Sequence, residues 1–475
     1  MESILSMSAT ILAQKIASQE VTSLQATETY IAHIQRFNPK LNLMVEERFH
    51  SAREEAKEKD QMIQNGRAKG KLFGVPVSVK ESFFVKGMKT TSGLPSRKNC
   101  IDSEDAQVIK YLKEEGAIIL GKTNTPTFCF CQETDNTVYG RSNNPWDITR
   151  TVGGSSGGEA ALIAVGGAAV GIGQDIGGSI RFPAHFNGVI GFKSGDKQVS
   201  DHGCYPPFTH PFQIRMLGIG AFAKSVADAQ LIHEIISELP MNAQDLSRFT
   251  YIIPKPHSAL PIQHKTAETI ENIFQFFSKQ GTVIREQPPF LLESALWWQL
   301  IMSVDGAQGL IDIAANSKIS VIIKEFLRAQ LGMNHTLHPF LTWAILGARM
   351  FQPSPKQWKE LEKELAQASA EVDVFLRKRI LILPVYHSPA GHHGKVYQEI
   401  FSIRKTFRRY MPYISYANTF GLPSLSIPVS EDPNGMPIGV QLITSAGQEH
   451  ALFIAGEQLE KSFRGYQRCT YYDHE

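Results

Sequence analysis

The sequence predicts an α/β fold: a single large domain with a central mixed, mostly parallel twisted β-sheet that is covered by helices on both faces. An apolar, β-branched run at 72–79, a helical pattern at 104–115 and a second apolar run at 117–120 follow one another in the order of a βαβ unit. The 475 residues are 42% hydrophobic and 20% charged, as in globular chains. No repeat or low-complexity linker divides them, so we expect residues 1–475 to form one domain rather than the roughly three that length alone allows.

Helices are expected to open the chain. Apolar residues recur at helical spacing over 8–18 and 22–37, and residues 46–65 form a charged helical pattern. Thr22 and Gln25 make a capping-box pattern at the start of the second helix. Asn38-Pro39 is expected to end that helix, because a residue that precedes proline disfavours the helical conformation.

The rest of the chain divides into three parts. Residues 153–195 are dense in glycine, serine and alanine, which predicts tight turns around a site. Residues from about 235 to 410 are more helical and less regular, and we expect this variable region to close one side of a pocket. Strands at Ser424–Val429 and Gly439–Thr444, with a helix at about 448–461, are expected to return to the core.

Charge and cysteine usage exclude several classes of protein. The formal charge is only +2 and no dense basic stripe is present, so we expect no nucleic-acid partner. Five cysteines without a CxxC pair indicate a reducing compartment, and Cys129 and Cys131 lie too close together in sequence to indicate a metal site. The N-terminus lacks the pattern of a signal peptide, and the apolar run Ala160–Gly173 is too short for a membrane span. We therefore expect a cytoplasmic protein.

Two short motifs suggest competing functions. Gly116–Thr123 fits the phosphate-loop pattern GxxxxGK[ST], but the four residues between its glycines (AIIL) have the character of a buried strand, which argues against nucleotide binding. Gly153–Gly157 fits the GxSxG nucleophile elbow of α/β-hydrolases. An elbow requires a strand directly before it, whereas residues 145–151 are polar and begin with proline. The elbow remains the less favoured alternative.

Longer blocks carry a more specific signal. They read LFGVPVSVKE at 72–81, GRSNNPWDITRTVGGSSGGEAA at 140–161, GIGQDIGGSIRFPAHFNGVIGF at 173–192 and YANTFGLPSLSIPVSEDPNGMPIGVQ at 416–441. Together they resemble the amidase signature family of serine hydrolases, with a core at about 72–195, the variable pocket region at about 235–410 and a C-terminal return at 416–461. Ile176 and Arg181-Phe182-Pro183 resemble the branch that contains fatty acid amide hydrolases and small bacterial or fungal amidases. The resemblance implies the amidase signature fold.

The resemblance also implies a Ser-Ser-Lys catalytic triad. Ser179 matches the nucleophile that becomes the acyl-enzyme, and Ser155, on a cis peptide after Gly154, matches the serine that relays protons to Lys80. The sequence supports the third role independently. Lys80 ends an apolar strand, where desolvation is expected to lower its pKa below the usual value of about 10.4 and to favour the neutral amine that a base requires. We therefore expect an alkaline activity optimum.

Further residues follow from the same resemblance. The oxyanion hole is expected to consist of the amides of Ile176, Gly177, Gly178 and Ser179, where paired glycines leave room for the substrate oxygen. Asp175 and Arg181 are expected to brace the turn, with Ser156 as a secondary hydrogen-bonding candidate. Cys129, Phe130 and Ser155 are expected to contact substrate, and Phe128 falls in the same acyl-channel segment.

The expected function is therefore an amidase. It would hydrolyse a carboxylic amide to an acid and ammonia or an amine through an acyl-serine, with a small-molecule amide as substrate and with neither a metal nor another cofactor. The chain is expected to be a monomer or homodimer without a membrane span. The alternative is an amidotransferase-type subunit that produces ammonia from glutamine within a complex.

Overall fold

A computed structural model describes residues 3–402 and 404–473. Its centre is an 11-stranded sheet in the order β1-β3-β2-β6-β8-β7-β12-β13-β11-β9-β10. A separate two-stranded sheet pairs β4 (Asn143–Asn144) with β5 (Asp147–Thr151). The strands of the large sheet are β1 (Met44–Glu47), β2 (Pro76–Lys80), β3 (Ile118–Thr123), β6 (Val170–Asp175), β7 (Ile190–Lys193), β8 (Gly218–Ala223), β9 (Thr250–Ile252), β10 (Val283–Ile284), β11 (Arg379–Pro384), β12 (Ser424–Glu431) and β13 (Pro437–Ile443).

The α/β class and the mixed character of the central sheet are as predicted, but the predominance of parallel pairing is wrong. Parallel pairs are confined to β3-β2-β6 and to β11-β9-β10, and the remaining neighbours in the sheet are antiparallel. The βαβ unit read from the sequence is the first of these parallel sets. Antiparallel pairing dominates among the later strands. For example, a turn at 432–436 joins β12 to β13, and so short a connection allows only antiparallel pairing.

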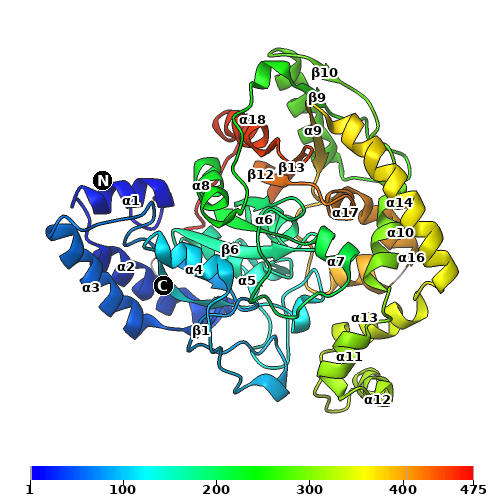
Figure 1. The fold of residues 1–475 in the computed structure, drawn as a ribbon, viewed down its shortest axis with the longest axis horizontal. Coiled ribbons are helices and arrows are strands. Elements are labelled where there is room, and N and C mark those ends of the chain that lie inside the picture. Colours follow the sequence, from blue (N-terminus) through cyan, green and yellow to red (C-terminus); the bar gives the residue numbers. More distant parts are fainter. Residues whose placement is uncertain (1–2, 403, 474–475) are drawn as a thin grey trace.

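Helices cover both faces of the sheet, as Figure 1 shows. Neighbouring residues of β7 demonstrate the two layers. A Cβ at Gly191 would lie 2.6 Å from Ala184 of α6, whereas the ring of Phe192 packs against His233 of α8 and Phe453 of α18. Successive side chains of a strand point to opposite faces, so α6 lies on one face and α8 with α18 on the other.

The helices are α1 (Ala9–Ala17), α2 (Ser23–Leu41), α3 (Phe49–Gln64), α4 (Gln107–Glu114), α5 (Gly157–Val165), α6 (Arg181–Asn187), α7 (Pro211–Met216), α8 (Val226–Ile236), α9 (His264–Ser278), α10 (Leu291–Met302), α11 (Gln308–Ala315), α12 (Ile319–Gln330), α13 (Pro339–Met350), α14 (Pro355–Leu376), α15 (Lys395–Tyr397), α16 (Arg404–Tyr410), α17 (Pro412–Thr419) and α18 (Glu449–Ser462). Short 3-10 turns occupy Pro95–Arg97, Thr127–Cys129 and Leu246–Arg248, and a π-helical turn spans Gln398–Ser402.

The N-terminal helices confirm one expectation and correct two. The capping box of Thr22 and Gln25 is present at the start of α2. Pro39 does not end this helix, which continues to Leu41 and stops where Asn42 takes a left-handed conformation. A proline in the last turn removes a single backbone hydrogen bond, so the helix tolerates it there. The predicted charged helix at 46–65 begins later, because its first residues belong to β1.

The variable region is largely helical, as expected. It contains α9 to α14, and Figure 1 shows α11, α12 and α13 together at the lower edge of the molecule. These three helices share a small hydrophobic cluster with Leu94, Phe128 and Tyr205. In the part of the chain that the structure describes, no helix is both long and apolar enough to cross a bilayer.

Candidate active site

Lys80 and Ser155 form the centre of the site. Lys80 is the last residue of β2 and is fully buried, and its Nζ donates a hydrogen bond of 2.6 Å to Ser155 Oγ. Ser155 lies in the turn between β5 and α5, and the Gly154–Ser155 peptide is cis, as the resemblance implied. In a nucleophile elbow the serine would be hydrogen-bonded to a histidine. The amine partner of Ser155 argues against that alternative.

The environment of Lys80 favours the uncharged amine. Burial lowers the pKa of Lys80 from its usual value, and this effect exceeds the opposing influence of Cys129, Asp175 and Cys204 nearby. A neutral amine carries the lone pair that proton acceptance requires. Lys80 therefore combines a geometry and an electrostatic state that suit a general base.

The turn that carries Ser179 is held by an ion pair. After β6, Asp175 accepts hydrogen bonds from the amides of Gly178 at 2.8 Å and Ile180 at 3.0 Å. Arg181 Nε donates to the same carboxylate at 3.0 Å, and both side chains are fully buried. Although burial opposes ionisation, the Arg181 guanidinium holds the pKa of Asp175 well below its usual range. Asp175 and Arg181 thus fix the backbone on both sides of Ser179.

The two serine-bearing turns are adjacent. The amide of Ser156 donates to the carbonyl of Ser179 at 3.2 Å, and Ser156 Oγ lies 3.4 Å from the carbonyl of Gln174. Ser156 therefore joins the turn of Ser155 to the end of β6 and to Ser179. Its amide and hydroxyl both take part, in line with its expected secondary role.

The four amides predicted to form the oxyanion hole are not all available to a substrate oxygen. The amide of Gly178 donates to Asp175, so the expectation that it faces the substrate oxygen is wrong. The sequence could not reveal this, because the competing acceptor depends on the path of the turn. Within the described residues, the amides of Ile176, Gly177 and Ser179 have no intramolecular acceptor. These three remain as candidate donors.

Two residues that the sequence analysis assigned no role orient this turn. Trp298 of α10 donates its indole N–H to the carbonyl of Ile176 at 2.7 Å, and Gln132 Nε2 donates to the carbonyl of Gly177 at 2.9 Å. In a trans peptide the carbonyl and the following N–H point in opposite directions. Trp298 therefore directs the Gly177 amide away from α10. No short-range pattern signals these contacts, since Trp298 lies 122 residues from its partner.

Glu159 is a further buried residue that sequence reasoning missed. It lies on α5 and accepts hydrogen bonds from the hydroxyls of Ser78 and of Thr123, the latter at 2.6 Å. Burial raises the pKa of Glu159 to about 8, even though Lys80 nearby acts in the opposite direction. A raised pKa favours the protonated acid near neutral pH, and an uncharged Glu159 near a neutral Lys80 leaves no unpaired charge in the interior.

A small pocket opens beside Ser179, and we call it the serine pocket. Cys129 and Phe130, which are expected to contact substrate, line it. Ser155 is buried and is not among its lining residues, and Phe128 packs against Tyr205. The full lining is Cys129, Phe130, Cys131, Gln132, Ile176, Gly177, Ser179, Trp298, Met302 and Phe401.

A larger apolar space lies beside the serine pocket, and we call it the distal cavity. It has a volume of about 250 Å³ and shares Phe130, Trp298, Met302 and Phe401 with the serine pocket. Its other walls come from Gln299, Ser303, Trp343, Ala344, Gly347, Ala348, Met350, Phe351, Ile400 and Phe407. Among the described residues that line either space, none carries a charged side chain.

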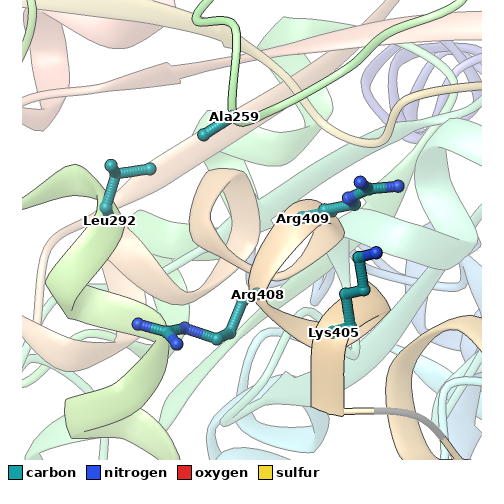
Figure 2. A pocket seen from close by; sticks show the side chains of 5 residues that line it. All are labelled: Ala259, Leu292, Lys405, Arg408 and Arg409. Atoms are coloured by element: carbon teal, nitrogen blue, oxygen red, sulfur yellow. The ribbon is translucent and has the colours of Figure 1, made fainter.

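Helix α16, which contributes Phe407 to the distal cavity, also carries a basic hollow on another side. Figure 2 shows Lys405 and Arg409 projecting together from α16 while Arg408 extends on the side of Leu292. This hollow, of about 690 Å³, shares no lining residue with the serine pocket or the distal cavity. Phe407 of α16 points into the distal cavity. The helix therefore separates a basic surface from an apolar interior.

Comparisons with known proteins identify the family of the chain. The family model for Amidase matches residues 25–453. Fatty-acid amide hydrolase 2-A of Danio rerio is 31% identical over 98% of this chain and 90% of its own length. A glutamyl-tRNA(Gln) amidotransferase subunit of Clostridium kluyveri (strain NBRC 12016) is 28% identical over 95% of this chain and 94% of its own.

Solved structures share the fold. A fatty acid amide hydrolase superposes with a TM-score of 0.81 at 22% identity, covering 96% of this chain and 85% of that one. A 6-aminohexanoate cyclic dimer hydrolase in complex with its substrate gives 0.79 at 23% identity, covering 98% of both chains. With the family match over nearly the whole sequence, these findings show that the chain belongs to the amidase family and hydrolyses carbon–nitrogen amide bonds.

Proposed function

We propose that this protein hydrolyses amides with an uncharged, apolar acyl group through an acyl-enzyme on Ser179. The observation that carries the proposal is the hydrogen bond of 2.6 Å from the buried Lys80 amine to Ser155, next to the turn that holds Ser179. A serine hydroxyl is a weak nucleophile until a base removes its proton, and a buried neutral amine is such a base.

The reaction proceeds in two halves. Lys80 takes a proton from Ser155, Ser155 takes one from Ser179, and the oxygen of Ser179 adds to the amide carbonyl. The amides of Ile176, Gly177 and Ser179 stabilise the negative charge on the carbonyl oxygen. The relay then returns the proton to the leaving nitrogen as the C–N bond breaks, and the amine departs. In the second half, water gives a proton to the same relay as its oxygen adds to the acyl carbonyl. The bond to Ser179 then breaks, the acid leaves, and the relay returns the proton to the Ser179 oxygen, which restores the free enzyme.

The lining of the pocket supports an apolar acyl group over glutamine. A glutamine donor carries an ammonium and a carboxylate, and burial of such charges without partners is costly. None of the described residues around the serine pocket or the distal cavity offers a charged partner. The relation to fatty-acid amide hydrolase 2-A also supports this substrate class. We therefore favour a free-standing amide hydrolase over an ammonia-producing subunit.

Covalent labelling tests the nucleophile. The purified chain is treated with an alkyl fluorophosphonate, and the adduct is located by peptide mass spectrometry. We expect the adduct on Ser179, with its formation lost in Ser179→Ala and slowed in Ser155→Ala and Lys80→Met. Ser388→Ala, at a buried serine outside the serine pocket, is the matched control and should label at the wild-type rate. An adduct on Ser155, or hydrolysis of acyl anilides by Ser179→Ala, would overturn the proposal.

A further inference from the structure

The distal cavity has walls of unequal bulk. Trp298 and Met302 of α10 and Phe407 of α16 provide large side chains. Trp343 and Met350 of α13 also line the cavity, but between them the wall is made by Ala344, Gly347 and Ala348, which carry no side chain beyond a methyl group. Their spacing of three and four residues places them on one face of the helix. The depth of the cavity in this direction is therefore set by α13.

Gly347 is the position where the wall is thinnest. A Cβ built there meets no atom within 4 Å, and the residue lies inside a regular helix. A side chain can therefore start at this position without a clash at its Cβ, and because Gly347 lines the cavity, a larger side chain there would occupy part of its volume. Replacing glycine also favours the helical state of α13. The position can thus be filled without loss of the fold.

We propose that the α13 face of Ala344, Gly347 and Ala348 determines the longest acyl group that the enzyme accepts. This inference rests on the proposed function, because it assumes that the acyl group extends from Ser179 through the serine pocket into the distal cavity. The two spaces share Phe130, Trp298, Met302 and Phe401 as walls, so they lie next to each other. An acyl chain attached to Ser179 therefore ends against α13 when it fills the cavity.

Chain-length profiles test the proposal. We would measure kcat/KM for a series of acyl p-nitroanilides from acetyl to palmitoyl in wild type and Gly347→Leu. Burial of each further methylene contributes roughly fourfold to kcat/KM until the chain reaches α13. In Gly347→Leu the rise should stop at a shorter chain, with roughly a tenfold or greater loss on the longest substrate that the wild type uses well and less than a twofold change for acetyl.

The matched control is Gly309→Leu on α11. That glycine is also helical, its nearest neighbour to a built Cβ is Asp305 at 3.9 Å, and it does not line the cavity. Its profile should match that of the wild type. Inactivation rates with short-chain and long-chain alkyl fluorophosphonates give a second readout that does not depend on the leaving group.

The outcomes separate the two proposals. An active wild type with the same chain-length profile in Gly347→Leu would overturn the assignment to α13 and leave the Ser179 mechanism intact. A wild type that neither cleaves any acyl anilide nor forms an adduct on Ser179 would overturn the proposed function itself. A chain-length profile that is shortened in Gly347→Leu but not in Gly309→Leu supports both the Ser179 mechanism and the assignment to α13.

Discussion

Trp298 and Ile176 are joined by a hydrogen bond of 2.7 Å between the indole N–H and the backbone carbonyl. This bond connects α10, in the variable region, to the turn that carries Ser179. The same indole packs on Gly177, where an added Cβ would lie 2.6 Å from its ring. The variable region thus contributes to the orientation of the candidate oxyanion donors as well as to the wall of the pocket.

Trp298→Phe should reduce catalysis with little change in fold. Phenylalanine retains much of the apolar contact but cannot donate to Ile176, so the Gly177 amide loses its fixed direction. Removal of one oxyanion donor costs roughly 10²–10³ in rate, and a misdirected donor should cost roughly tenfold or more in kcat. Steady-state kinetics on an acyl anilide, with thermal unfolding measured alongside, checks the effect. Trp297→Phe is the control, and equal kcat values in the two variants would contradict the interpretation.

Activity should rise with pH as Lys80 loses its proton. Only the neutral amine accepts a proton, and burial lowers the pKa of Lys80, so the acid limb of kcat/KM should lie below the usual lysine range of about 10.4. Lys80→Met should lower kcat by roughly 10²–10⁴. A limb that persists unchanged in the residual activity of Lys80→Met would show that another group controls it.

Although Lys80→Met should lower activity, it should raise the free energy of unfolding at neutral pH. Between the lowered pKa of the folded state and about 10.4, the unfolded chain holds a proton that buried Lys80 lacks, so stability rises with pH across that window. Methionine removes this dependence and the desolvation of the amine. Urea unfolding at several pH values should therefore show a variant that is more stable than wild type at neutral pH. A less stable variant would indicate that the amine stabilises the fold.

Glu159→Gln should preserve the site and remove a fall in stability with rising pH. Because the pKa of Glu159 is raised to about 8, the folded state holds a proton that the unfolded chain loses above about 4.5. Wild-type stability should then fall between pH 5 and pH 8 by up to about 1.4 kcal/mol per pH unit from this group. Glutamine imitates the neutral acid, so the variant should lose that slope and keep its activity at pH 7. Unfolding curves that retain the wild-type slope would count against a protonated Glu159.

Local sequence was sufficient to identify the candidate site residues that lie at strand ends and in the turns that follow them. Lys80 at a strand end and the glycine turn of Ser179 lie within continuous blocks, and the structure brings the turns of Ser155 and Ser179 together. Contacts between segments that are distant in the sequence could not be predicted from it. Trp298 and the α13 wall act through packing across more than a hundred residues, which no periodicity records. The engagement of Gly178 by Asp175 was missed for a related reason, since sequence identifies a flexible turn but not the direction of each amide.

Asp175→Asn should be the most destabilising of these substitutions. Arg181 is fully buried, and loss of the carboxylate charge leaves its guanidinium without an ionic partner while also weakening the bonds to Gly178 and Ile180. Breaking a buried ion pair by removing one charge costs roughly 3–5 kcal/mol. Asp147→Asn breaks the more exposed pair with Arg150, whose closest atoms are 2.9 Å apart, and should cost less than about 1 kcal/mol. Urea unfolding of both variants makes the comparison, and similar losses would show that Arg181 finds compensation from the oxygens of Ile414 and Gln441, to which it also donates.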